Sequence, residues 1–253
     1  MIISHVKSNT HEIQSNEEHS HGVAKLAEKF SNEFGLGSWG WIMGILHDKG
    51  KEQESFQTRI KRASGLENGP ICNAPHAYVG ALISKKIYPN GYPLLNWAIM
   101  CHHRGLSDYT DFENTIEEKQ IPDEVKIESD GRQLTAPRYP YKIDNKDWNH
   151  LERLLFSCLV DADYLDTEAF MQPETASHRG SNTPLRELLP LLEKHMENFS
   201  LDAPINKIRN EILNQCNSLA QGQKGFYSLT VPTGGGKTLA SISWAMRHAI
   251  HNR

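Results

Sequence analysis

Apolar residues in the first part of the chain recur three and four positions apart, the spacing of an α-helix that turns one face towards a core. Four such runs are found at 23–34, 39–46, 76–87 and 94–102. A fifth run, at 151–165, is strongly amphipathic. These patterns predict a mainly α-helical domain.

The stretches between and after these runs differ in character. Residues 107–147 are rich in Asp, Glu, Pro and Tyr and have no sustained period, so we expect a long and partly mobile excursion there. Residues 167–183 are expected to form a loop. Renewed helical spacing then predicts two helices at about 184–199 and 204–220.

Composition and charge narrow the class of protein only moderately. Of the 253 residues, 23% are charged and 38% hydrophobic, and the net charge is −4, which excludes a wholly basic protein but allows a local basic groove. The four cysteines are far apart and form no C-x-x-C motif, which indicates reduced thiols in a cytoplasmic protein. An apolar signal core and an apolar run of membrane-spanning length are both absent, so we expect no membrane partner.

Thirteen histidines are present, and several occupy places where a helix core would prefer an aliphatic residue. His47 and Asp48 end one predicted helix, and such a pair can bind two metal ions at once because the carboxylate has two oxygens. Further candidate ligands lie on inward faces or at ends of four other predicted helices, namely His19, His76, His102, His103, Asp161 and Asp163. A single inward histidine is usually a hydrogen-bonded core residue, but this many buried ionisable groups predict a metal site.

The order histidine, His-Asp, histidine and distal aspartate resembles the signature of the HD superfamily of metal phosphohydrolases. Its finer features are the runs His47-Asp48-x-Gly50-Lys51 and Asp161-Ala162-Asp163-Tyr164-Leu165-Asp166. They resemble the HD nuclease domain of the CRISPR-associated nuclease–helicase of type I interference, over about residues 15–250. The resemblance implies an HD helical bundle and assigns the metal ligands to the candidates above, with one of Asp161 and Asp163. The bulky residue and leucine that follow favour Asp163, whereas the helix face shared with Leu154 favours Asp161.

The resemblance also implies two divalent ions bridged by Asp48, which would activate a water and line it up with a phosphorus atom. Imidazole-rich ligation favours manganese, iron, cobalt or nickel over magnesium. Lys51 is placed to stabilise charge on the phosphate, unless it is a solvated lysine. We therefore predict Asp48 and Lys51 as the catalytic residues.

A change of period near the end of the chain predicts a strand at 226–231, a loop at 232–236 and a helix at 237–250. Glycines between a strand and a helix are the setting of a phosphate-binding loop, although its strict spacing would need glycine where Val231 stands. The form P-T-G-x-G-K-T instead resembles the helicase version of the loop. The candidate nucleotide-binding residues are Thr233, Gly234, Gly235, Gly236, Lys237 and Thr238.

Only fifteen residues follow Thr238, and the acidic residue that would hold magnesium for ATP hydrolysis is not among them. We therefore expect an N-terminal piece of a longer protein, with ATP and magnesium used by the full-length helicase only. The predicted fold is an HD helical domain at 1–200 with a variable insert at 107–147, followed by a linker helix at 201–222. Residues 223–253 would begin a RecA-like helicase domain, truncated after its strand–loop–helix unit.

Basic residues follow the His-Asp pair, namely Lys49, Lys51, Arg59, Lys61 and Arg62. They could follow the backbone of a single strand with a base stacked on Phe56, or they could form a solvated helix face with Phe56 in the core. Arg104 is a second candidate contact for nucleic acid.

The sequence thus predicts a metal-dependent deoxyribonuclease for single-stranded DNA. By resemblance, its full-length form would be recruited to a CRISPR surveillance complex that carries a guide RNA. One alternative is an HD phosphohydrolase of nucleotides or cyclic nucleotides, which the loop at 232–238 disfavours. Another is a non-catalytic module that binds nucleotides or nucleic acid, which the complete set of ligand candidates disfavours.

Overall fold

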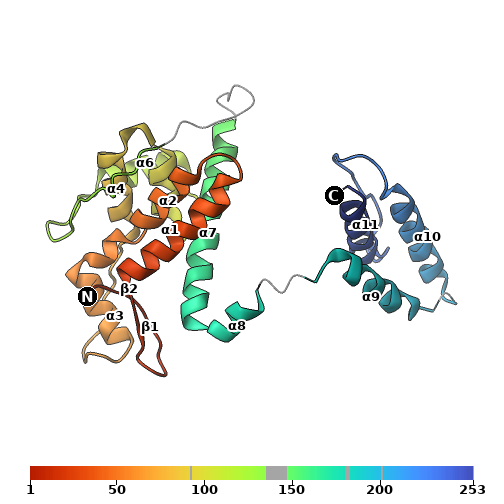
Figure 1. Ribbon diagram of the computed structural model, residues 1–253, viewed down its shortest axis with the longest axis horizontal. Helices are drawn as coiled ribbons and strands as arrows, with labels where there is room; N and C mark the ends of the chain where they lie inside the picture. Colours follow the sequence, from red (N-terminus) through yellow and green to blue (C-terminus); the bar gives the residue numbers. More distant parts are fainter. Residues whose placement is uncertain (92, 135–146, 180–182, 201, 253) are drawn as a thin grey trace. The chain divides into compact units, whose positions relative to one another are not determined.

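The computed structural model describes residues 1–91, 93–134, 147–179, 183–200 and 202–252 (Figure 1). The chain forms two compact units, Met1–His178 and Arg179–Arg253. The helix predicted at 184–199 belongs to the second unit, where it packs on the last helix of the chain.

The N-terminal unit begins with a short antiparallel hairpin that the sequence did not predict. Strand β1 (Ile3–Val6) pairs with β2 (Ile13–Ser15), with Val6 opposite Ile13. Strands of four and three residues are too short to show an alternating pattern. Gln57 holds the hairpin in place, since its side chain accepts a hydrogen bond from Ile3 N at 2.9 Å and donates one to Ile3 O at 3.0 Å.

The helices of the N-terminal unit confirm the predicted helical spacing. The bundle consists of α1 (Asn16–Asn32), α2 (Gly37–Leu46), α4 (Ala77–Ile87), α5 (Leu94–Cys101) and α7 (Asp147–Met171). Smaller elements are η1 (Lys49–Glu52), α3 (Glu54–Ala63), η2 (Pro89–Gly91) and α8 (Pro173–His178). The expected loop at 167–183 is therefore wrong for residues 167–171 and 173–178, which are helical. Its Glu, Ala and Met residues favour a helix but lack an apolar period.

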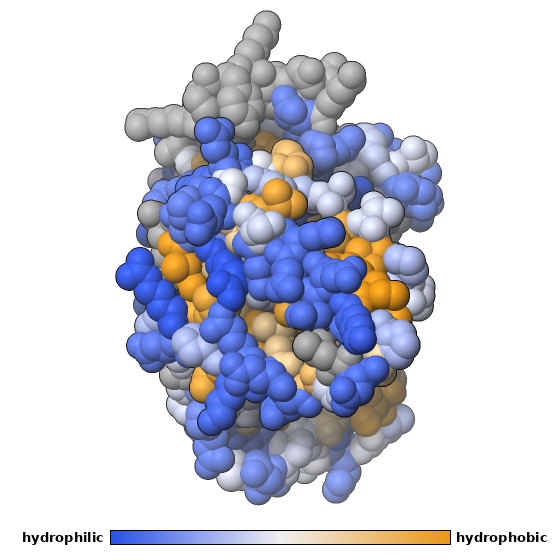
Figure 2. All heavy atoms as spheres, turned by 90° about the vertical axis from the view of Figure 1, so that its right-hand side faces the viewer, coloured by the Kyte–Doolittle hydropathy of each residue, from blue (hydrophilic) through white to orange (hydrophobic). Residues whose placement is uncertain are grey.

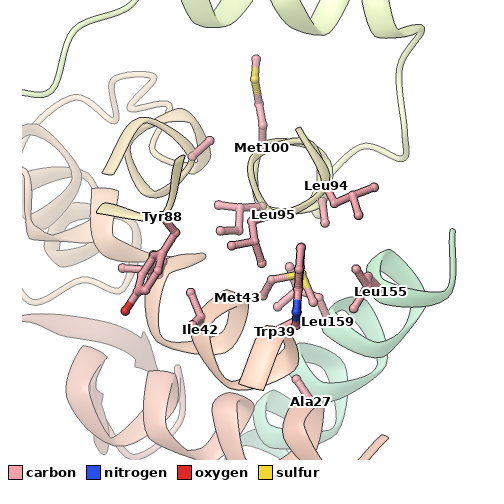
Figure 3. Close-up of a cluster of buried hydrophobic side chains, with 14 of the residues drawn as sticks. Ala27, Trp39, Ile42, Met43, Tyr88, Leu94, Leu95, Met100, Leu155 and Leu159 are labelled. Carbon is pink, nitrogen blue, oxygen red and sulfur yellow. The ribbon is translucent and has the colours of Figure 1, made fainter. Parts of the chain in front are cut away.

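The core lies between α1, α2, α4, α5 and α7. Figure 3 shows Met43 and Trp39 of α2 between Leu95 of α5 and Leu159 of α7. Helices α1 and α2 approach closely because α2 carries Gly44, where a Cβ atom would lie 2.4 Å from Ala24 Cα. This close backbone packing fixes α2, and therefore the residues that follow it, relative to α1.

Part of the expected excursion at 107–147 is ordered on this core. Helix α6 (Tyr109–Glu117) buries Phe112 and Ile116, one helical turn apart, and Val125 joins the same cluster. The expected excursion thus contains a helix, which the sequence did not predict because its two apolar positions are too few to reveal a period. The remainder of the predicted insert at 135–146 lies outside the described residues.

The C-terminal unit contains α9 (Leu185–Glu197), α10 (Pro204–Leu219) and α11 (Lys237–His251). The strand predicted at 226–231 is not formed, because a strand needs a pairing partner and the only sheet within the described residues is the β1–β2 hairpin. Phe226 is fully exposed instead. Figure 2 shows the right-hand side of Figure 1, where exposed hydrophobic residues (orange) lie between hydrophilic ones (blue). Over the described part of the chain, the helices lack the combined length and apolarity needed to cross a membrane.

Candidate metal centre

Asp48 is the centre of the site and is completely buried. His47 caps the C-terminal end of α2 and Asp48 caps the N-terminal end of η1, so the pair lies at the turn between these two elements. A Cβ atom at Gly50 would lie 2.0 Å from the carbonyl oxygen of His76. Glycine at this position therefore lets the turn pack against the chain that carries His76.

One oxygen of Asp48 faces a first histidine pair. Asp48 Oδ2 lies 3.4 Å from Nε2 of His19 and 3.2 Å from Nε2 of His47, and these two nitrogens are 3.3 Å apart. Asp163 Oδ1, from α7, lies 3.2 Å from Nε2 of His19 and 3.8 Å from Nε2 of His47. Four side chains from α1, the α2–η1 turn and α7 thus aim their ligand atoms at one point.

The other oxygen of Asp48 faces a second group of histidines. Asp48 Oδ1 lies 3.3 Å from Nε2 of His76 and 3.7 Å from Nε2 of His102. His103 joins this group, since its Nε2 atom is 2.8 Å from Nε2 of His76. The carboxylate therefore connects two sets of imidazoles, one on each oxygen.

Hydrogen bonds to the backbone orient two of the rings. Nδ1 of His47 donates to the carbonyl of Gly44 at 2.8 Å, and Nδ1 of His102 donates to the carbonyl of Ile99 at 2.6 Å. A carbonyl oxygen only accepts hydrogen bonds, so each Nδ1 carries a proton. In the neutral ring the Nε2 lone pair is then available to a metal ion.

The residues present fit divalent cations. Among the described residues, Oδ1 of Asp48 and Nε2 of His102 are buried without a hydrogen-bond partner. Leaving such groups unsatisfied in a protein interior is costly, and a bound cation would compensate. The ligand atoms fall into three overlapping groups, each compact enough to hold an ion. Their members are Asp48, His76, His102 and His103; His19, His47 and Asp48; and His47, His102 and Asp163.

The charges of the cluster agree with this chemistry. Burial lowers the pKa of His19, but the carboxylates of Asp163 and Asp166 outweigh it and raise that pKa to about 10. Burial raises the pKa of Asp48, but His47 and Lys51 hold it well below its usual range. Without a metal, a proton on His19 and the ammonium of Lys51 thus balance the carboxylates, and a cation bound here would displace a proton from His19.

Lys51, predicted to act on the phosphate, is buried. Its Nζ atom lies 2.6 Å from Asp48 Oδ2 and donates a hydrogen bond to Ser4 Oγ at 3.0 Å. In this position the lysine neutralises the same oxygen that faces His19 and His47. Its role towards a phosphate stays a prediction.

The two aspartates that the sequence left undecided separate clearly. Asp163 joins the cluster, whereas Asp161 is exposed and lies outside it. Two positions along a helix are about 200° apart, so only one of the two carboxylates can face the histidines. The structure therefore brings together seven of the eight predicted ligands and leaves Asp161 out.

Two residues near the cluster were missed by the sequence reasoning. Asp166 Oδ2 accepts hydrogen bonds from Nδ1 of His19 and Nε2 of Gln14, both at 2.8 Å. Its place three residues after Asp163, on the same helix face, was the available signal. The His5 ring lies 4.6 Å from the His19 ring, and burial lowers the His5 pKa to about 4. Its place in an unpredicted strand gave no signal.

The Asp166→Asn variant is expected to bind Mn²⁺ about 10- to 100-fold more weakly, since carboxylates that orient metal-ligating histidines contribute on that scale. Asn keeps the volume but removes the negative charge and one acceptor oxygen from the bond to His19. Isothermal titration calorimetry measures the affinity. Asp161→Asn on the same helix is the matched control, and equal affinities for the two variants would contradict this role of Asp166.

The predicted nucleotide-binding loop has the backbone of a tight glycine turn. Gly234 and Gly236 have φ angles of 84° and 79°, which favour glycine, and Lys237 begins α11. Arg209 of α10 closes the turn, because its Nε atom donates to the carbonyl of Gly234 at 2.8 Å. Lys237 and Thr238 are exposed. Nucleotide binding by this loop stays a prediction.

Comparison with known proteins gives one family. Residues 16–136 match the model of the HD domain, a segment that contains every candidate ligand from His19 to His103. No curated protein matches the chain. The match supports an HD-superfamily domain in the N-terminal unit. Together with the histidine–aspartate cluster, it indicates a metal-dependent phosphohydrolase.

Proposed function

We propose that the chain is a metal-dependent nuclease that hydrolyses phosphodiester bonds of single-stranded DNA. The observation that carries the proposal is the arrangement around Asp48, with one imidazole group on each carboxylate oxygen. A carboxylate shared in this way suits two adjacent divalent ions, which is a common arrangement for in-line displacement at phosphorus.

The ligands divide between the two ions. His19 and His47 would hold the first, together with Asp163, whose Oδ1 lies near both rings; His76, His102 and His103 would hold the second; and Asp48 would bind both. When bound, the ions supply an activated water and neutralise charge on the phosphate oxygens. Nitrogen-rich ligation favours manganese, iron, cobalt or nickel over magnesium. The hydrogen bonds of His47 and His102 to backbone carbonyls keep these rings in place as the ions bind.

We further propose that the natural setting is type I CRISPR interference, where a full-length nuclease–helicase would act with a surveillance complex and its guide RNA. Two features support it: the resemblance of the HD motifs, and the glycine turn at 233–236 that leads into α11. ATP and magnesium would serve the helicase part of that larger protein. A nucleotide phosphohydrolase would have no evident use for such a loop.

Incubation of the purified chain with Mn²⁺ and either circular or linear single-stranded DNA tests the nuclease. Loss of the circle indicates endonuclease activity, and loss of the linear strand alone indicates exonuclease activity. Chelation by EDTA should stop either reaction. Intact DNA together with hydrolysis of nucleotides or cyclic nucleotides would instead establish the small-molecule phosphohydrolase.

A further inference from the structure

A pocket of about 430 Å³ opens beside the second histidine group and is lined in part by His76 and His103. Three cationic side chains also line it: Arg59 of α3, Arg104 after α5 and Lys119 after α6. The described residues that line the pocket include no carboxylate. The metal cluster therefore borders a cavity whose fixed charges are all positive.

These cations differ from most other basic residues near the His-Asp pair. Lys49 pairs with Glu52 at 2.6 Å, and Arg62 pairs with Glu67 at 3.3 Å. Within the described ranges, Arg59, Arg104 and Lys119 form no ion pair. Their charge is thus available to an anion, and its potential extends over the pocket.

An aromatic residue completes the lining. Tyr78 donates a hydrogen bond from its hydroxyl to Gln53 Oε1 at 3.3 Å, and Lys119 Nζ lies 5.7 Å from the centre of its ring. Phe56, the aromatic residue first considered for base stacking, is buried against the His76 ring at 4.6 Å. Tyr78 is therefore the aromatic side chain available beside the cations.

We propose that this pocket binds the nucleotide next to the scissile phosphate, with the backbone phosphate on Arg59, Arg104 and Lys119 and the base against Tyr78. Cations that follow a backbone, with an aromatic residue on which a base stacks, are characteristic of sites for single-stranded nucleic acid. The volume suits one nucleotide rather than a duplex. The inference rests on the proposed nuclease function and deepens it, since it makes an extended strand the preferred substrate over a small phosphodiester.

The test compares wild-type protein with the triple variant R59A/R104A/K119A, each loaded with Mn²⁺. The substrates are a single-stranded oligodeoxynucleotide and bis-p-nitrophenyl phosphate, a diester too short to fill the pocket. For the oligonucleotide, KM is expected to rise at least tenfold while kcat changes little. The value of kcat/KM for the small diester and the Mn²⁺ content are expected to stay unchanged.

The matched control replaces three exposed lysines elsewhere on the N-terminal unit, Lys25, Lys29 and Lys126, by alanine. It removes the same charge and should leave KM unchanged. An unchanged KM in R59A/R104A/K119A would overturn the proposal. So would an equal loss on both substrates together with loss of Mn²⁺, because the three residues would then support the metal site instead.

Fluorescence anisotropy with a labelled oligonucleotide in EDTA separates this inference from the proposed function. The triple variant should bind the strand at least tenfold more weakly than wild type. In a plot of log binding constant against log salt concentration, its slope should be shallower by up to about two. This result would stand even if wild type cleaved no DNA. Equal binding by both proteins, or competition by a mononucleotide as strong as that by the oligonucleotide, would contradict the strand site.

Discussion

The Asp48→Ala variant is expected to lose both metal uptake and phosphodiester hydrolysis. Its two oxygens face separate imidazole groups, so one substitution removes a ligand from both. The expected fall in kcat is on the order of 10⁴-fold, the scale seen when one member of a catalytic unit is removed. Elemental analysis of the purified protein gives the metal-to-protein ratio, and hydrolysis of single-stranded DNA gives the rate.

The controls separate loss of ligation from loss of folding. Removal of the carboxylate leaves buried Lys51 without its ion-pair partner, so the double variant D48A/K51M keeps the comparison free of an isolated charge. Circular dichroism checks its helix content. On α7, Asp163→Ala should weaken metal uptake whereas Asp161→Ala should not. A metal-to-protein ratio like that of wild type in Asp48→Ala would disprove the site.

The Glu152→Gln variant is expected to be more stable than wild type. Glu152 is 2% exposed on α7, and within the described residues neither carboxylate oxygen has a hydrogen-bond partner. Burial raises its pKa to about 9. Between its ordinary pKa near 4.5 and this value, the folded protein keeps a proton that the unfolded chain releases, so the free energy of unfolding falls as pH rises.

Glutamine is neutral at every pH and avoids this loss. At pH 7 the expected gain is about 3 kcal/mol, or roughly 5–10 °C in the melting temperature of a domain of this size. Thermal unfolding at several pH values measures it, and the gain should grow from pH 5 to pH 9. Glu117→Gln at an exposed site on α6 is the control. A gain that does not depend on pH would show that Glu152 is ionised in the folded protein.

The parts of the fold that the sequence predicted are those with a long repeating pattern. Five helices show such a pattern, namely α1, α2, α4, α5 and α7. Each has several apolar residues on one face, so the helical period can be distinguished from a chance arrangement of apolar residues. Helix α6 and the β1–β2 hairpin are too short for this. The prediction of a strand at 226–231 was wrong for another reason. A strand needs a neighbouring strand to pair with, and the apolar pattern does not show whether such a neighbour is present.

The residues of the candidate site likewise fall into those that the sequence could predict and those that it could not. Candidate ligands next to a helix end or on an apolar face could be proposed from position alone, and the structure brings His47 and His19 together. The choice between Asp161 and Asp163 needed the rotation of α7, which the period of a 25-residue helix leaves undetermined at the level of one residue. The pocket beside His76 could not be predicted from the sequence, because Arg59, Arg104 and Lys119 come together only when three separate parts of the chain pack.

The hydrogen bond between His19 and Asp166 joins residues 147 positions apart. During synthesis, Asp48 and the second histidine group are made before α7, whereas the first group is incomplete until Asp163 of α7 follows. The two halves of the centre therefore mature at different times. Of the two, the half around His19 takes its final form only when α7 packs into the bundle, so a cation held there by all of its proposed ligands would report that the bundle has closed.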